Sequence, residues 1–132
     1  MDSKKLALAC RKFADDKKAE NLVVLDVRKL SSVTDFFVIV SATSEPHMRA
    51  IAEEISEKNR EKNGERPRAV DGTLRASWMV IDYVDVIVHI MRSDLRSHYD
   101  LEGLWGDAPR VVPRAPRARK KPTASDSAPA GL

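Results

Sequence analysis

The sequence is poor in aromatic residues and has a single cysteine. Its 132 residues include three Phe, two Trp, two Tyr and one Cys. Cys10 cannot form an intramolecular disulfide and has no cysteine partner for a metal site, which excludes a disulfide scaffold and a cysteine-rich zinc module. Because Cys10 shares a helical face with Leu6 and Phe13, we expect it to be a small buried hydrophobe.

Long apolar runs are also lacking. No stretch approaches the roughly 18 to 20 apolar residues that a membrane-spanning helix needs. The first residues, MDSKKLALACRKF, show neither the apolar segment nor the small-residue cleavage site of a secretory signal. We therefore expect a cytoplasmic protein with no membrane partner, and its length fits one small domain with room for a tail.

Positive charge in excess is confined to the last 22 residues. Residues 111–132 carry five Lys and Arg and one Asp, whereas residues 1–110 carry 18 basic and 19 acidic residues. The tail is rich in Pro, Ala and Ser and has no aromatic residue, so it cannot bury enough apolar area to offset its chain entropy. We expect a folded domain over 1–110 and a disordered tail over 111–132.

Two interpretations of the tail stay open. Its cations can attract RNA phosphates without regard to sequence, or they can simply keep the chain soluble. The residues concerned are Arg114, Arg117, Arg119, Lys120 and Lys121.

Hydrophobic periodicity divides the domain into helices and strands. It predicts helices over residues 2–18 and from Ser44, as N-cap, to Asn63-Gly64. Continuous apolar runs predict strands over 22–27 and 34–40, and a short extended piece over 68–70 precedes an expected turn at Asp71-Gly72. Residues 93–96 are expected to form a turn, and residues 99–105 a short helix.

The runs 77–83 and 84–91 lie so close together that they predict an antiparallel hairpin. If the loop comprises residues 83–84 or 82–85, the expected cross-strand pairs are Ile81 with Val86, Val80 with Ile87, Met79 with Val88 and Trp78 with His89. A three-residue loop would exchange the two faces. Since side chains alternate along a strand, the hairpin has two faces. The aliphatic face, expected to carry the helices, comprises Met79, Ile81, Val86, Val88 and Ile90. The mixed face comprises Trp78, Val80, Asp82, Asp85, Ile87 and His89, and Trp78 on it is typical of an interface anchor unless the C-terminal segment covers it.

Carboxylates near the hairpin turn raise an alternative function. Asp82 and Asp85, with Asp35, could hold a divalent metal for nucleotidyl transfer, with His89 as base. Against this, aspartates are common at turns, and no glycine-rich phosphate loop follows the second strand. A lone strand histidine is also more often structural, and His47, in a first helical turn, has no predicted ligand partners.

Taken together, several segments resemble one protein family. They are Leu25-Asp26-Val27, Thr34-Asp35-Phe36-Phe37-Val38-Ile39, Ser44…His47, Asp71-Gly72, Trp78-Met79-Val80-Ile81-Asp82-Tyr83, Val88-His89 and Tyr99-Asp100-Leu101-Glu102-Gly103-Leu104-Trp105. In this order and spacing, over about residues 4 to 112, the chain resembles the bacterial ribosomal silencing factors, or Iojap-like family. Three positions depart from the pattern: Ser41-Ala42 replaces a glycine, Asp71 a usual glutamate, and Val84 a frequent turn glycine.

The resemblance implies an α/β (α+β) fold, a single mixed sheet flanked by helices and similar to the nucleotidyltransferase fold without its catalytic motif. It implies no enzymatic activity and no cofactor. Members of the family bind the large ribosomal subunit, chiefly through ribosomal protein uL14, and sterically block the small subunit, which represses translation under nutrient limitation. The partner-binding residues that carry over are Asp71, Trp78, Tyr83, Tyr99, Leu101, Glu102 and Trp105.

A supporting role for Leu101 and Trp105, an accessory contact of the basic tail with ribosomal RNA, and a homodimer remain alternatives at this point.

Overall fold

A computed structural model describes residues 1–73, 77–96, 103 and 106–111. Within these residues the helices are α1 (Ser3–Asp16), α2 (Glu45–Lys58) and the four-residue α3 (Ser93–Arg96), and a π-helical segment, η1 (Asn59–Asn63), continues α2. The strands are β1 (Glu20–Asp26), β2 (Phe36–Ala42), β3 (Ala69–Thr73), β4 (Trp78–Asp82) and β5 (Val86–Arg92). No helix among these residues has the length and apolar character needed to cross a membrane.

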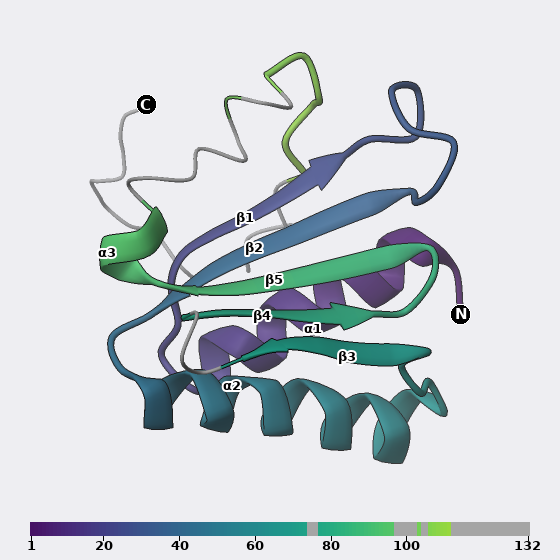
Figure 1. Cartoon of the computed structure of the whole chain (residues 1–132). Coiled ribbons are helices and arrows are strands. Elements are labelled where there is room, and N and C mark those ends of the chain that lie inside the picture. The colour runs from purple at the N-terminus through teal and green to yellow at the C-terminus, as the bar shows by residue number, and fades with distance from the viewer. Residues whose placement is uncertain (74–76, 97–102, 104–105, 112–132) are drawn as a thin grey trace, which may run out of the picture.

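The five strands form one mixed sheet, as predicted. Their order is β1-β2-β5-β4-β3 (Figure 1), in which β2 and β5 run parallel and the other neighbours run antiparallel. The predicted strand over 34–40 corresponds to β2, an interior strand, which explains its continuous apolar run. The α+β class and the mixed sheet are therefore confirmed.

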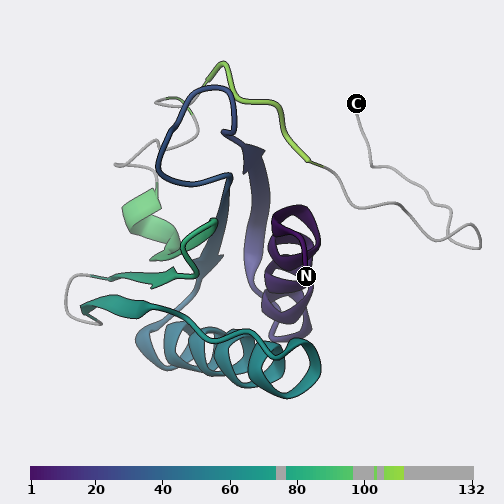
Figure 2. The ribbon, with the colours of Figure 1, turned by 90° about the vertical axis from the view of Figure 1, so that its right-hand side faces the viewer.

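Both long helices lie on one face of the sheet (Figure 2). Each begins with a side-chain cap: Asp2 accepts the backbone N–H of Lys5, and Ser44 accepts that of His47. The α2–η1 unit ends at Gly64, which has a left-handed φ of 66°, as the Asn-Gly signal predicted.

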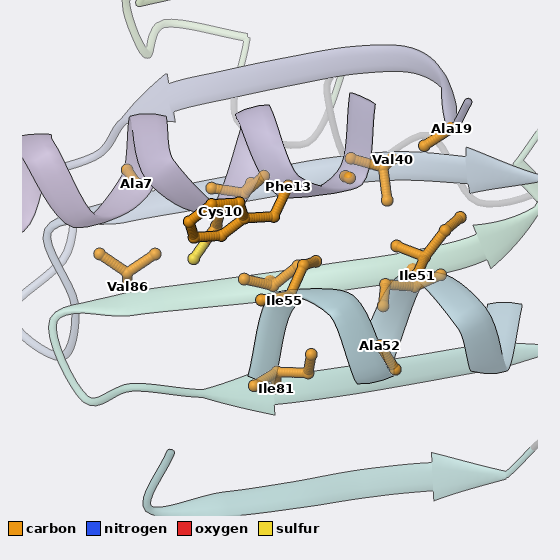
Figure 3. Packing of buried hydrophobic residues seen from close by; sticks show 14 of the residues in the cluster. Ala7, Cys10, Phe13, Ala19, Val40, Ile51, Ala52, Ile55, Ile81 and Val86 are labelled. Atoms are coloured by element: carbon orange, nitrogen blue, oxygen red, sulfur yellow. The ribbon is translucent and has the colours of Figure 1, made fainter. Parts of the chain in front are cut away.

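The main core lies between the helices and the sheet. Figure 3 shows α1 contributing Cys10 and Phe13, α2 contributing Ile51 and Ile55, and β4 contributing Ile81. Cys10 is fully buried, and burial raises the pKa of its thiol to about 12, so it behaves as the predicted small hydrophobe.

A smaller core lies on the opposite face, next to β1. It joins alternate β1 side chains to Ile39 and to Ala108 from the C-terminal segment. The same segment pairs with the β1 backbone: Asp26 N–H donates to the Pro109 carbonyl and Val111 N–H to the Val24 carbonyl, each over 2.8 Å. This edge of the sheet is therefore covered by the chain itself.

The hairpin faces are as predicted, but the register is not. The observed pairs are Asp82 with Ile87, Ile81 with Val88, Val80 with His89, Met79 with Ile90 and Trp78 with Met91. Each residue of β4 pairs two positions further along β5 than expected, and a shift of two leaves every side chain on its predicted face. The cause is the turn, where Val84 has a φ of 76° and Asp85 N–H donates to the Tyr83 carbonyl over 2.9 Å. This contact closes a three-residue γ-turn.

Two local predictions were wrong. Asp71-Gly72 lies inside β3 rather than in a turn, and Gly72 has a φ of 92° there. Residues 93–96 form α3 rather than a turn. Gly72 is needed because a Cβ built on it would overlap the backbone oxygen of Trp78. The glycine that indicated a turn is thus required by the close approach of β3 to β4.

Candidate functional site

The sheet face opposite α1 and α2 carries the candidate site, and we call it the Trp78 face. Alternation along β4 and β5 directs Trp78, Val80, Ile87 and His89 to this side, while their neighbours in sequence enter the helix-side core. The parallel pairing of β2 with β5 brings Phe37 opposite Ile87 on the same face. All five of these side chains are half-buried.

At the centre of the Trp78 face, Trp78 and His89 are in direct contact. The indole Nε1–H donates a hydrogen bond to His89 Nδ1 over 3.1 Å, and the ring centroids are 5.9 Å apart. Phe37 packs edge-on against the imidazole, with centroids 5.4 Å apart and an interplanar angle of 79°. The imidazole, which is itself packed against Phe37, thus holds the indole in a defined orientation.

His89 is neutral in this arrangement. Its Nδ1 accepts the hydrogen bond from the indole N–H, so the ring proton of the neutral imidazole is on Nε2. Desolvation by burial lowers the pKa of His89 to about 4, which keeps the lone pair on Nδ1 available at neutral pH.

Two aspartates lie on the same face as Trp78. Asp71, on β3, is exposed and pairs with Val80 in the β3–β4 ladder. Asp82, at the end of β4, forms an ion pair with Arg68 and accepts the Val84 N–H over 2.7 Å. Burial raises the pKa of the Asp82 carboxyl, but the bonds from Arg68 and Val84 N–H outweigh it and leave the pKa below its usual value.

Tyr83 lies on the other side of the sheet. Its side chain is only 7% exposed, packs in the helix-side core and receives a 3.3 Å hydrogen bond from Asn59 Nδ2. Burial raises the pKa of its hydroxyl to about 12. Tyr83 therefore lies outside the Trp78 face.

Four of the predicted partner-binding residues belong to the short helix expected over 99–105. Tyr99, Leu101, Glu102 and Trp105 lie outside the residues that the structure describes. The site can therefore be built only from Asp71, Trp78 and their neighbours on the sheet.

The alternative function required a divalent-metal site formed by Asp82 and Asp85, with Asp35. In the described part of the chain, no three His, Cys, Asp or Glu side chains gather closely enough to hold a metal ion. The Asp82 carboxylate is engaged by Arg68 and the turn, and Asp85 contributes its backbone carbonyl to the N–H groups of Asp35 and Phe36. The Asp82 carboxylate therefore acts in the turn and in an ion pair, and Asp85 holds the start of β2 through its backbone carbonyl.

His47 has a structural contact for each ring nitrogen. Its Nδ1 accepts the Thr43 N–H over 2.9 Å, and its Nε2 lies 2.7 Å from the carbonyl oxygen of Lys17, to which it donates. This side chain joins the beginning of α2 to the end of α1.

Sequence reasoning missed Phe37 and Arg68 as parts of this face. Phe37 sits in a continuous apolar run, where only the pairing of β2 with β5 reveals which side it faces. Arg68 reaches Asp82 because β3 pairs with β4, and the predicted turn at Asp71-Gly72 concealed that pairing. The signal that could have revealed β3 is Gly72, because a glycine inside a strand often marks the close approach of another backbone.

Comparisons with known proteins identify relatives of one family. The family model described as "Ribosomal silencing factor during starvation" matches residues 1–131. The chain is 40% identical over 111 residues to the ribosomal silencing factor of Halalkalibacterium halodurans, which covers 84% of this chain and 94% of that protein. It is 38% identical over 109 residues to the ribosomal silencing factor of Bacillus subtilis, covering 83% of this chain and 92% of that protein. Its fold is similar to the crystal structure of a Chromobacterium violaceum protein, with a TM-score of 0.76 and 27% sequence identity. The match covers 80% of this chain and 88% of that one.

Proposed function

The chain belongs to the ribosomal silencing factor family, and from this membership we propose that it binds the large ribosomal subunit and prevents the small subunit from joining it. The contact is made by the Trp78 face, and the partner is the large-subunit ribosomal protein uL14. The role is regulatory rather than enzymatic, is exercised in the cytoplasm and lowers translation during nutrient limitation.

The observation that carries the contact assignment is the half-buried aromatic and aliphatic side chains gathered around Trp78 on the sheet face that the two long helices leave uncovered. Tryptophans in such positions dominate the binding energy of protein interfaces because they bury a large, rigid surface. His89, which packs against Phe37, fixes the orientation of the indole before the partner arrives, and this reduces the entropy lost on binding.

Charge supports a basic partner. Residues 19–110 contain 16 Asp and Glu and 12 Lys and Arg, and Asp71 is exposed beside Val80 on the Trp78 face. An acidic surface attracts and orients a basic ribosomal protein through complementary potentials. The domain, once docked, excludes the small subunit by its bulk.

Replacement of Trp78 tests the contact directly. We expect Trp78→Ala to weaken co-sedimentation with purified large subunits by roughly 30-fold or more, the loss typical of an interface hot spot. Asp71→Lys should also weaken binding, and because Asp71 is exposed this variant should leave the melting temperature nearly unchanged.

Val70→Ala is the matched control, because Val70 is 51% exposed and pairs with Ile81, whose side chain faces the helices. Binding of large subunits by Trp78→Ala and Asp71→Lys at the wild-type level would refute the contact assignment.

A further inference from the structure

The contact between Trp78 and His89 fixes which nitrogen of the imidazole carries the ring proton. The indole Nε1–H can only donate, so His89 Nδ1 must accept this hydrogen bond, which is 3.1 Å long. Burial lowers the pKa of His89 to about 4, so at neutral pH the imidazole is neutral and has a single ring proton. His89 Nε2 is therefore an N–H donor for as long as the indole bond lasts.

This donor has no partner within the described part of the domain. His89 Nε2 forms no hydrogen bond with any residue that the structure describes. Among those residues, Thr34 Oγ1 is the one buried side-chain polar atom without a partner, so His89 Nε2 is not sealed in the interior. Strand side chains stand roughly perpendicular to their sheet, and Nε2 is the ring nitrogen farther from the backbone. The N–H group of His89 is thus on the outer side of its contact with the indole.

The surroundings of His89 suit a protein partner. Its neighbours across the sheet are Val80 on β4 and Ile39 on β2, and Phe37 packs edge-on against its ring. Beyond Val80, the exposed carboxylate of Asp71 lies in the same row on β3. Adjacent strands are about 4.8 Å apart, so about 10 Å separates the backbones of Asp71 and His89. The row offers an acceptor, an apolar surface and a donor, and protein interfaces typically combine such groups.

We propose that His89 Nε2–H donates a hydrogen bond to an oxygen of the protein that docks on the Trp78 face, and that this bond contributes to the choice of partner. The inference rests on the proposed function, in which that protein is uL14. When the partner covers the face, His89 loses its contact with water, and a donor left without an acceptor opposes binding. A surface with an apolar group opposite His89 is therefore rejected, whereas one with a carbonyl or hydroxyl oxygen there is accepted.

Glutamine and glutamate at position 89 separate the donor from the indole contact. The two side chains have the same shape, and each has an oxygen that accepts the Trp78 N–H, but only glutamine keeps an N–H for the partner. We expect His89→Gln to weaken binding of isolated uL14 by no more than about threefold, and His89→Glu by about tenfold or more, since its hydrogen bond is left unmade. Charge alone gives the opposite order, because a further carboxylate on this face would attract a basic protein.

The indole proton reports whether Trp78 keeps its place in the two variants. Its proton–nitrogen NMR resonance, identified by its absence from Trp78→Ala, should stay near the wild-type position in both His89→Gln and His89→Glu. Loss of the indole hydrogen bond in His89→Glu, together with loss of binding, would assign the effect to the orientation of Trp78 and overturn the donor role. Binding by His89→Glu that equals or exceeds that of His89→Gln would overturn it as well.

Wild-type protein and Trp78→Ala keep this test apart from that of the proposed function. If the wild type binds uL14, Trp78→Ala does not, and both variants at position 89 bind as the wild type does, the contact stands and the donor role fails. If Trp78→Ala binds as the wild type does, the contact assignment fails and the role of His89 fails with it. Purified large subunits should give the same order of affinities. An order seen with large subunits and absent with isolated uL14 would place the acceptor outside that protein and contradict the proposal.

Discussion

At the scale of single residues, Val84 is the most strained position in the hairpin. Its φ of 76° is left-handed, a region that a β-branched residue avoids, and its side chain is 45% exposed, so little packing offsets the strain. We expect Val84→Gly to raise the free energy of unfolding by about 1 kcal/mol, because relief of strain exceeds the added entropy of the unfolded chain. Urea denaturation measures the difference.

Val33→Gly is the control for Val84→Gly, since Val33 is 73% exposed and has no positive φ. There, only the entropic cost of glycine applies, and stability should fall slightly. A loss of stability in Val84→Gly as large as in Val33→Gly would contradict strain at the turn.

His89 makes stability depend on pH. Its pKa in the folded protein, about 4, lies below the value of about 6.5 for an unfolded chain. Above pH 6.5 the imidazole is neutral in both states and its contribution is complete. As pH falls towards 4, the unfolded chain takes up a proton that the folded protein does not, so stability falls, by up to about 3 kcal/mol.

His89→Gln isolates this effect, because glutamine can accept the Trp78 indole N–H and does not titrate. Chemical denaturation of both proteins at pH 7, 6, 5 and 4 should show a steeper decline for the wild type. Parallel declines would mean that His89 is not held neutral by the fold.

At the scale of elements, the β3–β4 pair depends on Gly72. A Cβ at this position would overlap the Trp78 backbone oxygen, so the strands must separate to admit any side chain. We expect Gly72→Ala to lower the free energy of unfolding by about 2 to 4 kcal/mol, measured by thermal or urea denaturation. Large-subunit binding should fall with it, because the displaced backbone carries Trp78.

Gly64→Ala provides the comparison for this substitution. Gly64 has a similarly left-handed φ of 66° but nothing within 4 Å of an added Cβ, so the variant should lose only about 1 kcal/mol. Equal losses at Gly64 and Gly72 would show that backbone conformation, and not the close approach of β3 to β4, sets the requirement for glycine.

Local patterns in the sequence were enough to predict most elements. The caps at Asp2 and Ser44 and the Gly64 signal are decided within a few residues, so the helix ends could be predicted closely. The faces of β4 and β5 follow from alternation alone. The register of β4 against β5 could not be predicted, because it depends on a left-handed backbone conformation at Val84, which a valine does not indicate.

The aromatic centre of the site was only half predictable. Trp78 and His89 were placed on one face by alternation. Phe37 joins them through the parallel pairing of β2 with β5, two strands about 50 residues apart in the chain, and no local pattern encodes that pairing. Alternation indicated an interface anchor at Trp78, and only the family resemblance supplied the partner proposed for it.

At the scale of the whole molecule, the domain is polarised in two respects. The two long helices, α1 and α2, cover one face of the sheet (Figure 2), and Trp78 lies on the other face. The basic excess lies on α1 and the tail, while residues 19–110 are acidic overall. An acidic body suits the basic partner proposed for the Trp78 face, because complementary potentials favour association.

Subunit joining, followed by light scattering on mixing small subunits with large subunits preincubated with the protein, tests the central claim most directly. Wild-type protein should suppress the rise in scattering in proportion to the fraction of large subunits occupied, and Trp78→Ala at the same concentration should suppress it far less. Unimpeded joining at saturating wild-type protein, or equal suppression by Trp78→Ala, would contradict the account.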